Sequence, residues 1–399
     1  STGGFADSGQ GGVTQMELAV MRRLLTFHRV PNLRHANTVE CVASAPKEHS
    51  DAEMSRCRIA KRCGKDTRVA IKLALAGDTM LGRGVADRLA TSSPESLFAP
   101  EIVEIANEAD LFILNLECCI SERGTRWAAP GKAFFFRAPA SAAEALAHLG
   151  VDCVCLANNH ALDFGEEALQ DTFDHLAQVG IAWAGAGADV DRARAPAVLR
   201  AGAFRLGVLS LCDHPEDFAA GAGRPGVAFA DLRRGVPDWV PAAVRSVEAD
   251  AVLVTPHWGP NMVRSPVPHV RRTARALVGA GATLVAGHSA HVFHGVEGRV
   301  LFDLGGFIDD YAVDPVLRND LGLLWLLTLD AGGPLSLEAV PLSLDFCRTR
   351  LADGADAAWV EQRLTDACRA MGTEVIAEGR RLKMSFNATV RRTGRTGFG

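Results

Sequence analysis

The chain contains a single tyrosine among its 399 residues, and aromatic side chains make up only 6% of it. Charged residues account for 22% and give a formal net charge of -5. The sequence therefore lacks the basic excess that is typical of nucleic-acid-binding proteins. It also contains no run of 18 apolar residues, the minimum for a membrane-spanning helix. We expect neither a nucleic-acid partner nor membrane insertion.

The ten cysteines show no CxxC pair and no spacing typical of a disulfide framework. Cys118, Cys119, Cys153 and Cys155 lie in or beside strand-like apolar runs, where cysteine acts as a small hydrophobic residue. The sequence begins with Ser1-Thr-Gly-Gly, which is polar and does not resemble a signal peptide. We expect a reduced, cytoplasmic protein.

Hydrophobic residues make up 48% of the chain, a composition typical of globular domains. Between residues 69 and 343, strand-like and helix-like segments alternate, which predicts an α/β fold. Apolar runs near the C-terminal end of this region favour antiparallel hairpins, so the sheet is expected to be mixed. The predicted helices are 141–149, 165–179, 267–280 and 359–371, and further predicted strands are 206–211, 299–304, 321–329 and 335–342.

The remaining parts of the chain have little periodicity. Residues 1–67 are Gly-rich and basic in patches, with one possible helix at 16–27. We interpret them as a disordered tail or an N-terminal extension. Residues 388–399 are predicted to be a frayed basic tail, which leaves a single domain at 68–387.

Five short apolar runs each end on a residue that can bind a metal. Such runs are typical of buried strands, and ligands of α/β proteins gather beyond the carboxyl ends of the strands. Five Asp, Glu, Asn or His residues at such positions indicate a shared site. The runs are 73–78 ending at Asp78, 111–117 ending at Glu117, 151–160 ending at Asn159 and His160, 251–257 ending at His257, and 282–288 ending at His288.

Asn158-Asn159-His160, followed by Asp163, is the most specific of these motifs. An Asn amide oxygen is a neutral hard ligand, and the neighbouring His160 can act as a proton donor or as a positioning residue. Asp163 could hold His160 in one tautomer. The alternative is an Asn-rich turn that leads into the following helix.

The fourth and fifth runs contribute imidazoles. His257 and His288 close them, and His291 follows three residues later. Without thiolates, the set indicates Mn, Fe, Zn, Mg or Ca, and six donors would suit either two ions or one ion with a wide coordination shell. Arg137, after an aromatic run, is a candidate for binding a carboxylate or phosphate, or else a surface residue.

Together these motifs resemble the CapA-like family, which is named for poly-γ-glutamate capsule synthesis and belongs to the calcineurin-like metallophosphatase superfamily. The similarity covers about residues 69–344. It implies a four-layer α/β/β/α sandwich with mixed sheets, and it makes Asp78, Glu117, Asn159, His257, His288 and His291 the metal ligands. His160 would take the place of the transition-state-stabilising histidine. Two departures stand out: Met80 replaces a histidine of the first motif, and the usual Gly-His-x-His is stretched to Gly287-His-Ser-Ala-His291.

The resemblance leaves several functions open. Some soluble CapA-like proteins resemble enzymes that tailor ribosomal peptides, including epimerases of lasso-type precursor peptides. This favours metal-dependent Cα epimerisation of a peptide substrate, with His160 and Asp163 moving the proton and Arg137 binding a peptide carboxylate. The alternatives are metal-dependent phosphoester hydrolysis, a role in poly-γ-glutamate synthesis, and a non-catalytic scaffold.

Overall fold

The computed structural model describes residues 69–128 and 132–386. All of them belong to one compact unit. The predicted helix at 16–27 and the predicted tails at 1–67 and 388–399 fall outside the described residues, and the domain boundaries therefore stay a prediction. No helix in the described ranges combines the length and the apolar character needed to cross a membrane.

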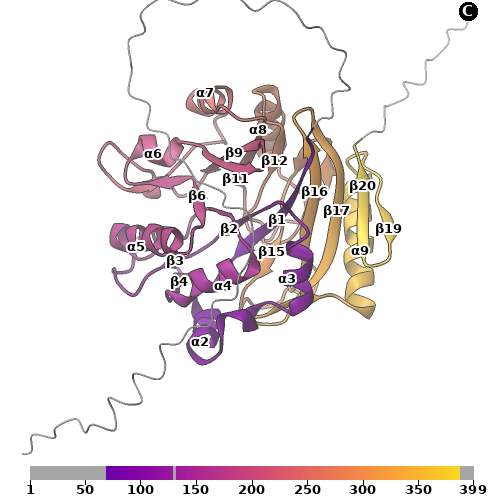
Figure 1. Ribbon diagram of the computed structural model, residues 1–399, viewed down its shortest axis with the longest axis horizontal. Helices are drawn as coiled ribbons and strands as arrows, with labels where there is room; N and C mark the ends of the chain where they lie inside the picture. The colour runs from indigo at the N-terminus through magenta and orange to yellow at the C-terminus, as the bar shows by residue number, and fades with distance from the viewer. Residues whose placement is uncertain (1–68, 129–131, 387–399) are drawn as a thin grey trace, which may run out of the picture. The chain divides into compact units, whose positions relative to one another are not determined.

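The larger sheet is mixed and has ten strands (Figure 1). Its order is β19-β20-β17-β16-β1-β2-β5-β6, with β15 beside β1 and β18 beside β17. The strands β1, β2, β5 and β6 run parallel, while β16, β17, β20 and β19 form antiparallel pairs. The bounds are β1 (Ile71–Thr79), β2 (Leu111–Leu116), β5 (Cys153–Cys155), β6 (Ala182–Ala184), β15 (Gly306–Ile308), β16 (Leu321–Asp330), β17 (Gly333–Leu344), β18 (Thr349–Leu351), β19 (Ile376–Glu378) and β20 (Arg381–Ser385).

The smaller sheet has six strands in the order β13-β14-β12-β11-β9-β8. Its four inner strands are parallel and its two edge strands pair antiparallel. Two further strand pairs, β3 with β4 and β7 with β10, lie outside both sheets. The bounds are β8 (Ala197–Ala201), β9 (Phe204–Cys212), β11 (Ala251–His257), β12 (Leu284–Ala286), β13 (Val296–Glu297), β14 (Val300–Leu301), β3 (Cys119–Ile120), β4 (Arg137–Ala138), β7 (Ala186–Gly187) and β10 (Gly226–Val227).

The four helices predicted within the described residues are present, whereas α2, α3, α6 and α7 were not predicted. Helix α4 occupies the predicted residues 141–149 and ends at Gly150, whose φ of +86° gives the left-handed C-cap that glycine favours. Helices α5 and α8 match two further predictions to within one residue at each end, whereas α9 begins five residues earlier than expected. The bounds are α2 (Arg83–Thr91), η1 (Pro94–Leu97), α3 (Pro100–Ala106), α4 (Ser141–Leu149), α5 (Gly165–Gln178), α6 (Val190–Arg194), η2 (Glu216–Phe218), α7 (Trp239–Ser246), α8 (Pro268–Gly279) and α9 (Gly354–Arg369).

Three apolar cores show how the layers stack. The first contains side chains of α3, α4 and α5 together with one face of β1 and β2, such as Ala74 and Phe112. The second joins the opposite face of those strands, Leu73 for example, to Val208 and Leu253 of the smaller sheet. The third lies between the outer face of the smaller sheet and helices α7 and α8. The order is helix, sheet, sheet, helix, which confirms the predicted four-layer sandwich (Figure 1).

Other expectations from the sequence are met as well. The C-terminal apolar runs form the long antiparallel hairpin β16–β17, although the run at 299–304 contributes its strand, β14, to the smaller sheet instead. The seven cysteines within the described residues are all buried and unpaired, which confirms their role as small core residues. Burial raises the pKa of the Cys155 thiol to about 11, so this sulfur is uncharged.

Strand alternation decides where the candidate site lies. In β2 and β11, odd-numbered residues such as Ile113 and Leu253 face the space between the sheets. Glu117 and His257 continue these two series, so their side chains turn to the same side. In β1 the register against β2 shifts between Ala76 and Asp78. This bulge lets Asp78, an even-numbered residue, join the others.

Candidate metal centre

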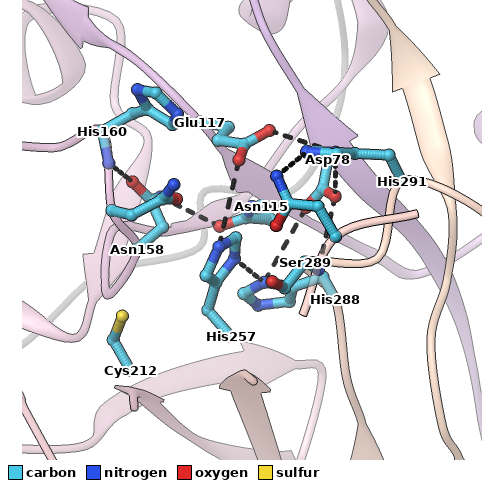
Figure 2. A network of polar contacts seen from close by, with 12 residues as sticks. Asp78, Asn115, Glu117, Asn158, His160, Cys212, His257, His288, Ser289 and His291 are labelled. Atoms are coloured by element: carbon cyan, nitrogen blue, oxygen red, sulfur yellow. Dashed lines mark hydrogen bonds and ion pairs between the residues drawn. The ribbon is translucent and has the colours of Figure 1, made fainter. Parts of the chain in front are cut away.

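The five strand ends predicted to share a site come together between the two sheets (Figure 2). Asp78 lies in β1, Glu117 follows β2, and the Asn158–His160 turn follows β5, all in the larger sheet. His257 ends β11, and His288 follows β12, in the smaller sheet. The carboxyl ends of these parallel strands therefore supply every polar group of the cluster, as is usual for ligand sites in α/β folds.

The cluster contains two sets of three donors that share Asp78. One set is Asp78, His257 and His288, and the other is Asp78, Glu117 and His291. In each set, one ligand atom per residue lies within 4.8 Å of the others, and all five side chains are buried. Asp78 lies 2.8 Å from His291 Nδ1 and 3.9 Å from His288 Nδ1. Glu117 lies 3.7 Å from His291 Nδ1 and 3.9 Å from His257 Nε2.

Several of these buried atoms have no hydrogen-bond partner. Both carboxylate oxygens of Glu117, His257 Nε2 and His291 Nδ1 are in this position, the last despite its close approach to Asp78. Leaving a buried charge or lone pair unpaired costs free energy of about 1–3 kcal/mol or more. A cation bound among them would satisfy these atoms together. The donors thus fit a divalent metal, and the mixture of carboxylate and imidazole suits several first-row ions.

The electrostatics of the cluster follow from burial and mutual repulsion. Burial and the neighbouring charge of Asp78 raise the pKa of Glu117 well above its usual value. Burial would lower the pKa of His291, but the charges of Glu117 and Asp78 outweigh this and raise it to about 10. Burial alone would raise the pKa of Asp78, yet its interactions with His291 hold it below 3.8. In the metal-free protein, a proton on His291 therefore provides the positive charge that the carboxylates need.

Backbone geometry brings His288 and His291 to the same carboxylate although the motif is one residue longer than usual. Ser289 and His291 have φ values of +114° and +59°, which reverse the loop within three residues. Such conformations are strained for residues other than glycine and are common at functional sites. Ser289 N also donates to Asp78 Oδ2 at 3.3 Å. The extra residue is thus accommodated by the turn, and both imidazoles remain beside Asp78.

Position 77 must be a glycine because the backbone of Gly305 approaches it closely. A Cβ atom at this position would lie 1.9 Å from the carbonyl oxygen of Gly305. The same carbonyl accepts a hydrogen bond of 2.9 Å from Asp78 N. The Gly77-Asp78 pair therefore fixes the bulge that aims the carboxylate, and this is the physical reason for a small residue before the aspartate.

A chain of amides orients Asp78. Asn115 Nδ2 donates to Asp78 Oδ1 at 2.8 Å, Asn158 Nδ2 donates to Asn115 Oδ1 at 3.0 Å, and His160 N donates to Asn158 Oδ1 at 3.0 Å (Figure 2). The sequence motif predicted Asn159 as the ligand. The side chain that joins the network is that of Asn158, while Asn159 Oδ1 is buried without a hydrogen-bond partner. Asn158 belongs to the Asn158-Asn159-His160 motif and Asn115 lies within the apolar run 111–117, but neither was assigned a role from the sequence.

His160 and Asp163 form a buried pair beside the cluster. Their Nδ1 and Oδ2 atoms are 2.6 Å apart, and Lys132 Nζ lies 2.8 Å from the other oxygen of Asp163. The ring of Phe136 stacks on His160 with centroids 4.0 Å apart, and its backbone N–H donates to Asp163 at 2.6 Å. Burial lowers the pKa of His160 to about 4 in spite of the adjacent carboxylate. The imidazole is therefore neutral at pH 7, with Nδ1 directed to Asp163.

Arg137 and Met80, which were singled out from the sequence, contact other parts of the chain. The guanidinium of Arg137 lies 4.3 Å above the ring of Phe164, and Nη1 donates to the carbonyl of Arg123. None of its described contacts involves the carboxylate–histidine cluster. Met80 is fully buried, and its sulfur accepts a hydrogen bond from Gly82 N at 3.1 Å. The thioether is thus engaged with the backbone at the position where the resemblance led us to expect a histidine.

Comparison with known proteins places this geometry in a family. The model of a bacterial capsule synthesis protein family, PGA_cap, matches residues 72–311. The chain is 33% identical over 285 residues to a probable polyglutamine synthesis accessory protein of Mycobacterium tuberculosis, covering 67% of this chain and 74% of that protein. It is 28% identical over 247 residues to the PGA biosynthesis protein CapA of Bacillus subtilis, covering 60% and 63%. A solved hypothetical protein from Thermus thermophilus has a TM-score of 0.41 at 15% identity, covering 69% of this chain and 100% of that one. The matched region contains every donor of the cluster, and the chain belongs to the bacterial capsule synthesis protein family, PGA_cap.

Proposed function

We propose that the protein is a metal-dependent enzyme that performs acid–base chemistry on a peptide-type substrate, with exchange of a Cα proton as its reaction. The observation that carries this proposal is the buried pair of His160 and Asp163 beside two donor sets that share Asp78. A proton-transfer group and a candidate metal site so close together are what such chemistry requires.

Asp78, Glu117, His257, His288 and His291 would hold the metal, and Asn159, whose buried amide oxygen has no partner, would complete the set. A bound divalent cation polarises a carbonyl or carboxylate and so makes the adjacent Cα–H more acidic. The unpaired buried atoms support this role, because the described part of the chain supplies no group that satisfies them.

His160 would move the proton. Asp163 accepts from Nδ1, which leaves Nε2 of the neutral ring as the basic atom. Lys132 and the Phe136 backbone N–H hold Asp163 in place. The stacked ring of Phe136 covers the imidazole and limits the access of water. Removal of the Cα proton by His160, followed by delivery of a proton from water to the opposite face, would invert the residue without changing its composition; the proton on His160 returns to the solvent.

The choice of substrate follows from the relatives. Their names refer to polyglutamine synthesis and PGA biosynthesis. A γ-linked polyglutamate and a ribosomal precursor peptide, such as a lasso-type precursor, share the group on which the reaction acts, a Cα–H beside a carbonyl or carboxylate. A role as a component of poly-γ-glutamate synthesis is therefore the second candidate, favoured by these names. A metallophosphatase-type hydrolysis is the third.

The test is hydrogen exchange in D2O. Metal-loaded protein is incubated with a γ-glutamyl oligomer or with a lasso-type precursor peptide, and the product mass is read. We expect uptake of one deuterium per reacting residue, abolished by a chelator and by His160→Gln. His148→Gln, at an exposed position in α4, serves as the matched control and should keep the activity.

The outcomes separate the candidates. Cleavage of the oligomer without deuterium uptake at Cα would replace epimerisation by hydrolysis. Release of phosphate from a panel of phosphoesters, with no change in any peptide, would overturn the choice of a peptide-type substrate. Full exchange by the His160→Gln variant would remove His160 from the reaction.

A further inference from the structure

The guanidinium of Arg83 is held rigidly beside the candidate centre although no sequence pattern singled it out. Its Nε donates to Asp310 Oδ2 at 3.2 Å, and its Nη2 lies 3.1 Å from Oδ1 of the same carboxylate. Asp310 is fixed in turn by Gly84 N, which donates to it at 2.9 Å. The side chain of Asp310 is 6% exposed, whereas that of Arg83 is 36% exposed. The carboxylate is therefore a buried anchor and the guanidinium reaches solvent.

Three aromatic rings surround this guanidinium. Its Cζ lies 5.8 Å from the ring centre of Phe134, 5.7 Å from Phe136 and 5.8 Å from Tyr311. The last two rings contact the site directly. Phe136 stacks on His160, and Tyr311 meets His291 edge-on with centroids 5.2 Å apart. Arg83 thus lies one aromatic ring away from both the acid–base pair and the candidate metal ligands.

Two features of this cluster are energetically unfavourable on their own. Arg83 has a φ of +52°, a left-handed conformation that costs an arginine about 1–2 kcal/mol. The hydroxyl of Tyr311 is buried and has no hydrogen-bond partner among the described residues. A buried donor without a partner is costly, so a ligand that accepts from it would gain affinity. Both features are typical of a binding site whose polar groups are satisfied by a bound ligand.

We propose that Arg83 and the Tyr311 hydroxyl form a subsite that binds a carboxylate of the substrate. Asp310 occupies the edge of the guanidinium formed by Nε and Nη2, and the remaining Nη1 edge carries none of the described hydrogen bonds or ion pairs. An arginine edge and a hydroxyl donor can together bind the two oxygens of a carboxylate. The buried ring of Phe136 lowers the dielectric on one side of the guanidinium and so strengthens the attraction.

This subsite deepens the proposed function and rests on it, because it specifies an anionic peptide such as a γ-glutamyl chain. It also takes the role that the sequence pattern gave to Arg137. That side chain is directed to Phe164 and to the carbonyl of Arg123. Arg83, in contrast, shares its aromatic neighbours with His160 and His291.

The experiment uses the single tyrosine of the chain as a reporter. Metal-loaded full-length protein is labelled with 3-fluorotyrosine, which gives one 19F resonance at Tyr311. A γ-glutamyl hexamer is titrated, with its fully amidated analogue as the neutral probe, and the same titrations are repeated by calorimetry on unlabelled protein. The variants are Arg83→Gln, Arg83→Lys and Arg137→Gln. Arg126→Gln, an exposed arginine over the ring of Phe135, is the matched control for loss of one positive charge.

We expect the hexamer to shift the Tyr311 resonance and Arg83→Gln to weaken its binding at least tenfold, the scale of one charge-assisted hydrogen bond. The Arg83→Lys variant keeps the positive charge but loses the planar guanidinium group. Its affinity for the hexamer should therefore lie between those of wild type and Arg83→Gln. The amidated hexamer should bind all proteins equally weakly. An unchanged metal-induced rise in Tm would show that the Arg83 variants remain folded with the metal site intact.

Other results would overturn the inference in distinguishable ways. Equal binding of the hexamer by wild type and Arg83→Gln would remove Arg83 from recognition while leaving the substrate class standing. A loss confined to Arg137→Gln would restore the assignment made from the sequence. If wild-type protein binds the metal but neither hexamer, the peptide-type substrate itself is wrong and the subsite falls with it.

Discussion

Replacing Glu117 by glutamine should stabilise the metal-free protein and at the same time weaken its response to metal. Glu117 is fully buried, neither oxygen has a hydrogen-bond partner among the described residues, and Asp78 repels its charge. Removing such a charge should stabilise the metal-free fold by about 1–3 kcal/mol. In a domain of this size each kcal/mol corresponds to roughly 2–4 °C in Tm. The metal-free variant should therefore melt several degrees above wild type.

Addition of metal should raise the Tm of the wild-type protein above that of the Glu117→Gln variant. At a free metal concentration of about one hundred times Kd, binding stabilises the wild-type protein by about 2.7 kcal/mol. The glutamine variant loses an anionic donor, so its gain at the same concentration should be much smaller. Thermal melts of both proteins, followed by circular dichroism with chelator and with Mn²⁺ or Zn²⁺, give the four Tm values. Glu104→Gln, at an exposed position in α3, should behave as wild type in both conditions.

The stability of the metal-free protein should fall as the pH rises, because of Glu117. Because burial raises the pKa of Glu117 above its value in the unfolded chain, the folded protein binds this proton more tightly. The metal-free wild type should lose stability as the pH rises above about 4.5, and the variant should lose less. A metal-free variant that melts at or below the wild-type Tm would show that the chain itself compensates Glu117. Full retention of the metal response by the variant would remove Glu117 from the ligand set.

Two further predictions concern positions around the centre, and a third concerns the ion pair of Glu108 with Arg381. Gly77→Ala should destabilise the protein by about 3 kcal/mol or more in urea titrations and abolish the metal-induced rise in Tm, because its Cβ would clash with a backbone carbonyl 1.9 Å away; unchanged stability would contradict the bulge. Asp163→Asn should lower turnover about 100-fold with the metal response intact, since His160 loses the acceptor that fixes its tautomer; full turnover would refute that role. Glu108→Gln should lower the free energy of unfolding by about 1 kcal/mol at pH 7. This value is reduced for solvent screening, because a third of the side chain is exposed. The hydrogen bond from Arg381 lowers the pKa of Glu108 to about 2, so this contribution should be present above pH 4.5 and disappear as the pH falls toward 2, and an unchanged difference at pH 2 would contradict it.

Much of the fold could be predicted because its signals are local. Apolar runs of strand length and amphipathic segments of helix length gave α4, α5, α8 and the β16–β17 hairpin at nearly the observed bounds. The α/β alternation, together with the family resemblance, gave the four layers. The division of strands between two sheets could not be derived in this way. The strand β14 shows the limit, because its two residues pair with β12 and β13 in the smaller sheet through contacts that no local pattern encodes.

The sequence predicted the residues of the candidate site that lie at or just after strand ends, but not the contacts that form between distant segments. Each donor follows an apolar run, so the sequence located Asp78, Glu117 and the three histidines, which the structure brings together. The role of Asn158 in orienting Asp78 depends on its hydrogen bonds to Asn115 and to Leu116 O, and these form only across the sheet. Arg83 was missed for a similar reason. Its anchor, Asp310, lies 227 residues away, and nothing near Arg83 in the sequence marks the contact.

Charge balance sets an expectation for how many metal ions the protein holds tightly. The two donor sets share Asp78, so together they contain only two carboxylates, and in the metal-free protein His291 carries one compensating proton. One divalent cation would neutralise both carboxylates and release that proton, together with the proton that the raised pKa of Glu117 favours on its carboxyl group. A second would leave two excess positive charges in a buried site, and the position of Met80 offers it no imidazole. We therefore expect close to one equivalent of metal after dialysis, measured by plasma mass spectrometry, and a second equivalent only when an anionic peptide is bound. Two equivalents retained by the peptide-free protein would show that other buried groups supply the missing negative charge.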